Sequence, residues 1–532
     1  MTASRCAAAL AAALALSAAL VGATAHAAPT PAASPSGQPW VASVGDSFIA
    51  GEAGRWAGNQ SGSTDDIDAL GSSAYWDAEG GEAIEFCHRS RSAPIHIGVV
   101  RSVNLACSGA LTSTHFDDGA FKPGIDFYSK DGRKGQALML QEFAADHRVR
   151  MVGLSIGGND FGFESIITQC VTDFLRPWPF SAQCRNSAEV QRALSPQRVD
   201  AVRADIREAI LNVATAMERA GYADAEWTLV LQLYPRPLPS SDRVRYPQFG
   251  YGRQVVGGCG FTDDDLDWAA GPLVETINGT VTAAAADALE RRPGLQVEAM
   301  DPSRAFEERQ LCHDEVWRVR ERGSLGALRG PSSWRDADAV DRSEWVSEIN
   351  VVNLGETYQE ESLHPNYWGQ LALRNCWRQV WNSGDVRGGT CTRGPGAGLT
   401  EDCEPRMTFV AGDPSSRGVV TPRAAPAVAQ RDAEVSLRCP GITVRAGSTA
   451  VLRGRVTPVG GGGEVLLQAS LDGGSWRDRA RAVPGPDGDF RFTQRIPRSA
   501  PEGRTYRWRV VALSGSDVLA VSVVRSASVR GR

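Results

Sequence analysis

The sequence predicts an α/β domain with a parallel sheet, followed by a smaller β-sandwich. From Trp40 to about Thr400, short apolar strands alternate with amphipathic helices, a rhythm typical of a parallel sheet with helices on its outside. Beyond a segment rich in Pro, Gly, Ala and Ser, strands alternate with turn signals and no helical period appears. The length of 532 residues also exceeds that of one average domain.

Each element of the α/β domain has its own signal. Strands are expected at 41–44, 151–156, 228–233 and 295–300, each a short apolar run that ends at Gly or Pro or just before one. The clearest helix has Ser195 as its cap and Pro196 in its first turn, carries apolar residues at helical spacing, and stops at Gly221. A second helix is expected over Tyr367 to Trp381.

The second region has the pattern of a small immunoglobulin-like β-sandwich. Its strands are expected at 449–456, 464–471, 490–496, 506–513 and 518–524. The predicted organisation is a signal peptide (1–27), a Pro/Ala tether (28–39), the α/β domain (40–405), a linker (406–430) and the sandwich (431–532).

The N-terminus predicts secretion. Arg5 precedes an apolar run of Ala and Leu, and Ala25-His26-Ala27 forms a cleavage site of the A-x-A type. The apolar run is borderline in length for a membrane anchor and consists mostly of alanine, so we expect a soluble, extracellular protein without a transmembrane segment.

The cysteines agree with an oxidising compartment. Eleven are present, and cleavage would remove Cys6, which leaves an even number. Their spacing favours pairing between neighbours, although it does not fix the connectivity. The expected pairs are Cys87–Cys107, Cys170–Cys184, Cys259–Cys312, Cys376–Cys391 and Cys403–Cys439. Zinc is the alternative, but the cysteines are dispersed and no C-x-x-C occurs, so no metal is expected.

Charge excludes one class of partner. The chain has 56 basic and 62 acidic residues and a net charge of -6, which gives no electrostatic footprint for nucleic acid. We therefore expect no nucleic-acid partner.

Four motifs fall at strand ends or in the loops that follow, where open α/β sheets place their ligands. Ser47 lies in Gly45-Asp-Ser47-Phe-Ile-Ala-Gly-Glu52 after the first strand and could act as a nucleophile. Gly109 follows another strand, and Asn159 in Gly157-Gly158-Asn159-Asp160 offers an amide that could donate to an oxyanion. His364 lies three residues after Glu361, a carboxylate that could orient it.

The joint occurrence of these motifs, in this order, resembles the SGNH/GDSL hydrolase superfamily. Cys87-His-Arg-Ser90 and Asn104-Leu-Ala-Cys-Ser-Gly-Ala110 resemble its secreted actinobacterial esterase and lipase branch. The resemblance covers roughly Trp40 to Trp381 and implies a three-layer, flavodoxin-like fold. It also implies a serine esterase or lipase without a cofactor.

The resemblance assigns a role to each matching residue. Ser47 would attack the ester carbonyl and His364 would act as base, while the Ser47 and Gly109 amides and the Asn159 side chain would hold the oxyanion. The family usually has Asp three residues before the histidine, whereas this chain has Glu361, so either Glu361 or a backbone carbonyl would orient the imidazole.

Other interpretations compete with this one. Gly153-Leu-Ser155-Ile-Gly157 fits the nucleophile elbow G-x-S-x-G, but Ser155 lies in an apolar strand and no helix start follows it. Asp263 to Asp267 look like a calcium loop, but a helix start capped by Thr262 explains them better.

A secreted binding or adhesion protein with an inert hydrolase-like scaffold is the alternative function. The expected partner is an ester of a lipid or of an acylated carbohydrate, with contact to cell wall or polysaccharide through the C-terminal domain.

Overall fold

The computed structural model describes residues 34–530 apart from short gaps. The gaps are 61, 63, 178–180, 324–325, 351–358, 413–433, 439, 442, 458–462, 473, 515–516 and 523. The predicted signal peptide and residues 28–33 of the predicted tether lie outside the described residues.

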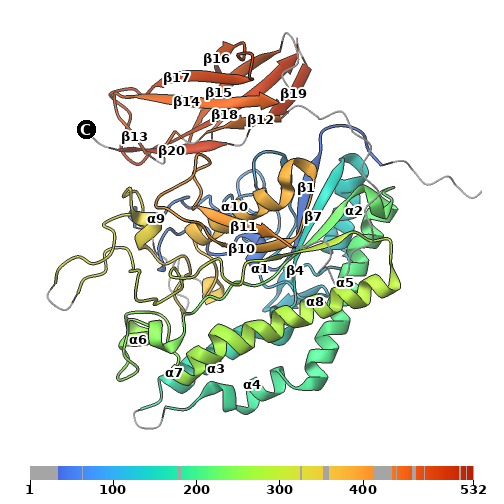
Figure 1. Cartoon of the computed structure of the whole chain (residues 1–532), viewed down its shortest axis with the longest axis vertical. Helices are drawn as coiled ribbons and strands as arrows, with labels where there is room; N and C mark the ends of the chain where they lie inside the picture. The colour runs from blue at the N-terminus through green and yellow to red at the C-terminus, as the bar shows by residue number, and fades with distance from the viewer. Residues whose placement is uncertain are drawn as a thin grey trace, which may run out of the picture. The chain divides into compact units, whose positions relative to one another are not determined.

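A seven-stranded sheet organises the first region (Figure 1). Its order is β11-β10-β9-β8-β7-β1-β2, with β11 antiparallel to its neighbour and the other strands parallel. The strands are β1 (Trp40–Gly45), β2 (Arg101–Asn104), β7 (Val149–Ser155), β8 (Thr228–Gln232), β9 (Val297–Asp301), β10 (Gly389–Arg393) and β11 (Met407–Ala411). The four predicted strands are confirmed as β1, β7, β8 and β9.

The strand order determines where a site can form. Numbered along the chain, the first five strands of the sheet lie in the order 2-1-3-4-5, which also occurs in flavodoxin-like sheets. The chain adds β2 on one side of β1 and then β7, β8 and β9 on the other side, so the order of the strands reverses next to β1. The carboxyl ends of β1, β2 and β7 lie at the same edge because these strands are parallel. Open sheets bind their ligands at this switch point.

Ten helices are described in the same region as the sheet, and the two longest, α5 and α8, pack against each other (Figure 1). Ser195 caps α5 through a hydrogen bond from the Arg198 N–H, as predicted, and α10 has the predicted bounds. The helices are α1 (Ser47–Ala50), α2 (Gln136–Asp146), α3 (Phe163–Phe174), α4 (Ala188–Ala193), α5 (Pro196–Arg219), α6 (Gly252–Val255), α7 (Asp263–Trp268), α8 (Val274–Arg291), α9 (Ala339–Arg342) and α10 (Tyr367–Trp381). Thr262 caps α7, which confirms the interpretation of the acidic run as a helix start.

Two short hairpins lie between β2 and α2. They comprise β3 (His115–Asp117) with β4 (Ala120–Lys122), and β5 (Ser129–Lys130) with β6 (Arg133–Lys134).

Four predicted disulfides are confirmed: Cys87–Cys107, Cys170–Cys184, Cys259–Cys312 and Cys376–Cys391. Cys403 is also disulfide-bonded, and its predicted partner Cys439 lies outside the described residues.

The predicted linker start at residue 406 is wrong. Met407–Ala411 form β11, which pairs antiparallel with β10 at the edge of the sheet. Met407 is buried and Phe409 packs against the core, so this segment belongs to the first region. The stretch 413–433, which holds most of the predicted linker, lies outside the described residues.

The C-terminal region contains two further β-sheets. The first joins β12 (Glu434–Leu437), β14 (Thr449–Thr457) and β17 (Asp489–Arg495). The second joins β13 (Thr443–Arg445), β20 (Arg525–Arg530), β18 (Thr505–Ser514), β15 (Glu464–Leu471) and β16 (Arg477–Ala482), with β19 (Asp517–Val521) also paired to β18. Leu452 and Phe490 of the first sheet and Leu467 and Trp508 of the second share one apolar core. The five predicted strands are confirmed, whereas β12, β13, β16 and β20 were not predicted.

Among the described residues, no helix combines the length and the apolar character that crossing a bilayer requires.

Candidate active site

The parallel strands bring three of the predicted residues to one edge of the sheet. Ser47 follows β1, Gly109 follows β2 and Asn159 follows β7. All three line one pocket together with His364. The residues predicted to act together are therefore neighbours in space.

Ser47 is held by the turn between β1 and α1. Gly45 has a positive φ of 136°, and a Cβ at this position would lie 2.1 Å from the Ser155 carbonyl oxygen, so only glycine fits. Asp46 caps α1 by accepting the Phe48 N–H, and the Tyr234 hydroxyl donates to its other oxygen. Burial raises the pKa of Asp46 to about 7, although these hydrogen bonds oppose the rise.

His364 faces Ser47 from the segment that leads into α10. Its Nε2 lies 2.6 Å from Ser47 Oγ, and its Nδ1 lies 3.0 Å from the Ser362 carbonyl oxygen. Because a carbonyl can only accept, the proton of the neutral imidazole lies on Nδ1. Nε2 is then the acceptor for the Ser47 hydroxyl, which is the arrangement of a nucleophile and its base.

Glu361 does not take the predicted place beside the imidazole. Both of its oxygens accept from Trp56 Nε1, at 2.9 and 2.8 Å, and one also accepts from the Tyr75 hydroxyl at 2.8 Å. The Ser362 carbonyl orients His364 instead, which was the other possibility that the sequence left open. The prediction of Glu361 as third member of a triad is therefore wrong in its geometry.

A second buried histidine completes a charged cluster behind the site. His88 Nδ1 contacts both oxygens of Glu52, at 2.9 and 2.8 Å, and its ring stacks on Tyr75 with centroids 4.5 Å apart. Burial alone would lower the pKa of His88, but the Glu52 carboxylate raises it to about 9. Burial would raise the pKa of Glu52, but the His88 charge holds it well below its ordinary value. At neutral pH the pair is ionised.

The charges of this pair also affect the pKa values of Glu361 and His364. Burial raises the pKa of Glu361 to about 8, and the negative charge of Glu52 adds to the rise, so Glu361 is largely protonated at pH 7. Burial lowers the pKa of His364, while the Glu52 charge and the Ser362 carbonyl oppose the decrease. His364 is thus neutral and available as a base near pH 7.

Three N–H groups at the pocket could hold a developing oxyanion. Within the described part of the chain, neither the Ser47 nor the Gly109 backbone N–H has a hydrogen-bond acceptor. Asn159 Nδ2 donates one hydrogen to the Ala110 carbonyl at 3.0 Å, which orients the amide and leaves its second hydrogen. Gly109 has a positive φ of 75°, which favours glycine there.

The competing motifs do not form a site. Ser155 is the last residue of β7, is 1% exposed, and does not line the pocket of Ser47. Among the residues that the structure describes, no group of three or more His, Cys, Asp or Glu could hold a metal ion.

Sequence reasoning assigned no role to Glu52, His88 or Tyr234, although the first two lie inside motifs that it singled out. The signal available was the pairing of Glu52, at the end of the Ser47 motif, with the histidine beside Cys87. Tyr234 lies at the end of a predicted strand, and nothing nearby in the sequence marks it as a partner of Asp46.

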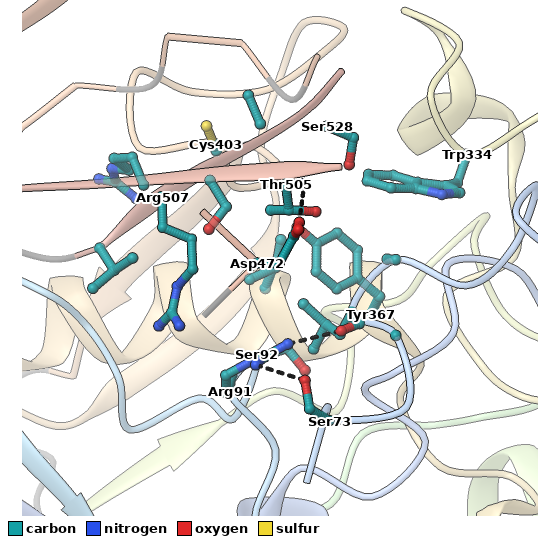
Figure 2. Close-up of a pocket in the computed structure, with 18 of the residues that line it drawn as sticks. Ser73, Arg91, Ser92, Trp334, Tyr367, Cys403, Asp472, Thr505, Arg507 and Ser528 are labelled. Atoms are coloured by element: carbon teal, nitrogen blue, oxygen red, sulfur yellow. Dashed lines mark hydrogen bonds between the residues drawn. The ribbon is translucent and has the colours of Figure 1, made fainter. Parts of the chain in front are cut away.

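A larger pocket lies elsewhere on the molecule (Figure 2). Figure 2 shows Arg91 directed toward Ser73, to which it donates at 3.2 Å, and Asp472 beside Thr505, whose N–H it accepts at 2.7 Å. None of the predicted catalytic residues lines this pocket.

Comparison of the chain with protein-family models and with curated proteins finds no match.

Proposed function

We propose that the protein is a secreted serine esterase or lipase that hydrolyses carboxylic esters. The observation that carries this proposal is the 2.6 Å contact between Ser47 Oγ and His364 Nε2, beside two backbone N–H groups that have no acceptor among the described residues. A nucleophile, a correctly oriented base and unused donors are the three parts that acyl transfer requires.

The reaction would proceed through an acyl-enzyme. His364 Nε2 takes the hydroxyl proton as Ser47 Oγ attacks the ester carbonyl, and the Ser362 carbonyl stabilises the resulting imidazolium through Nδ1–H. The Ser47 and Gly109 amides and Asn159 Nδ2 stabilise the oxyanion. His364 then protonates the departing alcohol, and a water molecule that it activates releases the acid. No step requires a cofactor or metal.

The family and fold assignments belong to the same proposal. The 2-1-3-4-5 order of the first strands supports a three-layer, flavodoxin-like SGNH/GDSL hydrolase. The shared core of the two C-terminal sheets supports an immunoglobulin-like sandwich. The disulfides and the A-x-A site support secretion.

The test is hydrolysis of p-nitrophenyl esters by the mature chain, by Ser47→Ala and by Ser155→Ala. We expect Ser47→Ala to reduce kcat/KM by at least about 10³-fold, because the nucleophile is lost. Ser155→Ala should retain turnover if it folds, which circular dichroism checks. Activity in Ser47→Ala equal to that of the parent would refute the proposal.

A contact with an anionic polymer of the cell wall is a second proposed role, for the C-terminal region. Residues 431–532 contain 17 arginines and nine acidic residues, although the whole chain is acidic. Arg453 and Arg491 lie directly opposite each other on β14 and β17, and both are exposed. Sedimentation of the full chain with purified cell walls, repeated with Arg453→Gln/Arg491→Gln, tests this role. If every chain lacks esterase activity but sedimentation persists, the binding-protein alternative is favoured.

A further inference from the structure

Two hollows of different chemistry meet at Ser47. Ser47, Asn159 and Phe163 line both of them, but His364 lines only one. The hollow that contains His364 is called the His364 hollow here, and the other is called the apolar hollow. Because the nucleophile lines both hollows, each is placed to receive one half of an ester.

The direction of proton transfer assigns the halves. His364 must protonate the alcohol oxygen as it departs, so the alcohol has to lie on the side of His364 Nε2. The acyl group is then left for the apolar hollow, which lies next to Ser47 and the Asn159 amide. This assignment rests on the proposed esterase function.

The apolar hollow is small, and its walls are closely packed. Its volume is about 20 Å³, enough for one water-sized or methyl-sized group. The Phe48 and Tyr234 rings meet edge to face with centroids 5.1 Å apart, and Ile277 of α8 is 3% exposed. Asn278 fixes α8 to the loop after β8 by exchanging two hydrogen bonds, of 2.8 and 3.0 Å, with the backbone of Tyr234. A long acyl chain would have to displace these packed groups.

Both apolar and acidic side chains line the His364 hollow. Its volume is about 70 Å³, and its lining includes the carboxylates of Asp117, Glu164 and Glu360. Burial raises the pKa of Glu164, and the negative charges of Glu360 and Asp117 add to the rise, so these groups lie close enough to interact. Lys122 contributes a cation, but its ammonium already donates to the Phe86 carbonyl at 2.9 Å. A phosphate or carboxylate on the alcohol would be repelled here, whereas hydroxyl groups would find acceptors.

We propose that the substrate is an acetyl ester of an uncharged polyhydroxy alcohol, such as an acetylated sugar. Ser47 Oγ bonds to the acetyl carbon, the bond from that carbon to the sugar oxygen breaks, and this oxygen takes the proton that His364 removed from Ser47. Water then adds to the acetyl carbon, gives a proton to His364, and releases acetate as Ser47 regains its proton. The reaction balances without an oxidant, a reductant or a metal.

The acyl half is tested with p-nitrophenyl acetate, butyrate and octanoate. We expect the kcat/KM for acetate to exceed that for octanoate by at least about 100-fold, since the hollow admits one methyl-sized group. Ile277→Ala should reduce this ratio by at least about tenfold because it lengthens the hollow. Val281→Ala removes apolar volume from the same buried face of α8 without lining the hollow, and should leave the ratio unchanged.

The alcohol half is tested by acetate release from peracetylated xylobiose and from diacetylglycerol phosphate. We expect the sugar to be preferred at least about tenfold, and Glu164→Gln/Glu360→Gln to reduce that preference. Equal rates on octanoate and acetate, or a preference for the phosphate ester, would overturn the inference while Ser47-dependent turnover still upheld the esterase. If no ester is hydrolysed in a Ser47-dependent way, both proposals fail.

Discussion

At the scale of single residues, the orientation of His364 comes from a backbone carbonyl, while the Glu52 carboxylate acts on it only through space. Ser362 O accepts from Nδ1, and Glu361 is occupied by Trp56 and Tyr75. Glu52 is the ionised carboxylate whose charge favours the imidazolium. Orientation and charge compensation, which one residue supplies in a Ser-His-Asp triad, are thus divided between two groups here.

This division predicts a mild effect for Glu361→Gln. Burial and the Glu52 charge raise the pKa of Glu361 to about 8, so glutamine resembles the protonated form present at pH 7. We expect kcat/KM for p-nitrophenyl acetate to fall by less than about tenfold, whereas loss of a triad carboxylate costs about 10⁴-fold. A decrease of 10³-fold or more in a folded variant would show that Glu361 acts as the triad acid after all.

The charge of Glu52 predicts a change in pH dependence. The base must be neutral, so kcat/KM rises with pH through the pKa of His364. Glu52 stabilises the protonated imidazole, and Glu52→Gln should therefore move the acidic limb of the profile to lower pH. Glu82→Gln is the control, because Glu82 lies 3.7 Å from His88 Nε2 and is not among the groups that act on His364. A limb that stays in place in Glu52→Gln contradicts this role.

At the scale of elements, the strand ends could be predicted better than the contacts between distant segments. The strands β1, β7, β8 and β9 are short apolar runs, and the residues that follow β1, β2 and β7 carry the recognisable motifs. The strand β10 was missed because Gly-Thr-Cys-Thr-Arg has no apolar alternation, and its pairing with β9 and β11 is what makes it a strand. The partners of Glu361 lie 305 and 286 positions away in the sequence, so no local pattern could have shown that its carboxyl is already occupied.

The contact between β1 and β7 predicts a strong effect for Gly45→Ala. A Cβ at Gly45 would lie 2.1 Å from Ser155 O, in addition to the strain of a positive φ. Positive φ alone costs about 1–2 kcal/mol for alanine, and we expect the free energy of unfolding in urea to fall by more than this. Gly119→Ala isolates the φ term, because Gly119 has a φ of 87° and a Cβ added there would meet nothing within 4 Å. Equal losses in the two variants would mean that the close approach to β7 is unimportant.

At the scale of the whole molecule, disulfides tie distant loops to the sheet that carries the site. Cys87–Cys107 joins the loop of His88 to the loop of Gly109, so it couples the charged cluster to the proposed oxyanion donors. Cys376–Cys391 joins α10, which follows His364, to β10. Cys170–Cys184 joins α3, which begins with Phe163 and Glu164 of the His364 hollow, to the loop before α4, and Cys259–Cys312 joins two loops that contain none of the four motifs.

The lengths of the closed loops predict an order of stabilisation. Cys259 and Cys312 are 53 positions apart, and Cys170 and Cys184 are 14 apart. A cross-link that closes the longer loop removes more entropy from the unfolded chain, about 4 kcal/mol against about 3 kcal/mol. We therefore expect Cys259→Ser/Cys312→Ser to lower the urea midpoint more than Cys170→Ser/Cys184→Ser, and dithiothreitol to remove the difference between the variants. If the shorter loop proves the more stabilising, native packing around Cys170 and Cys184 outweighs chain entropy in this protein.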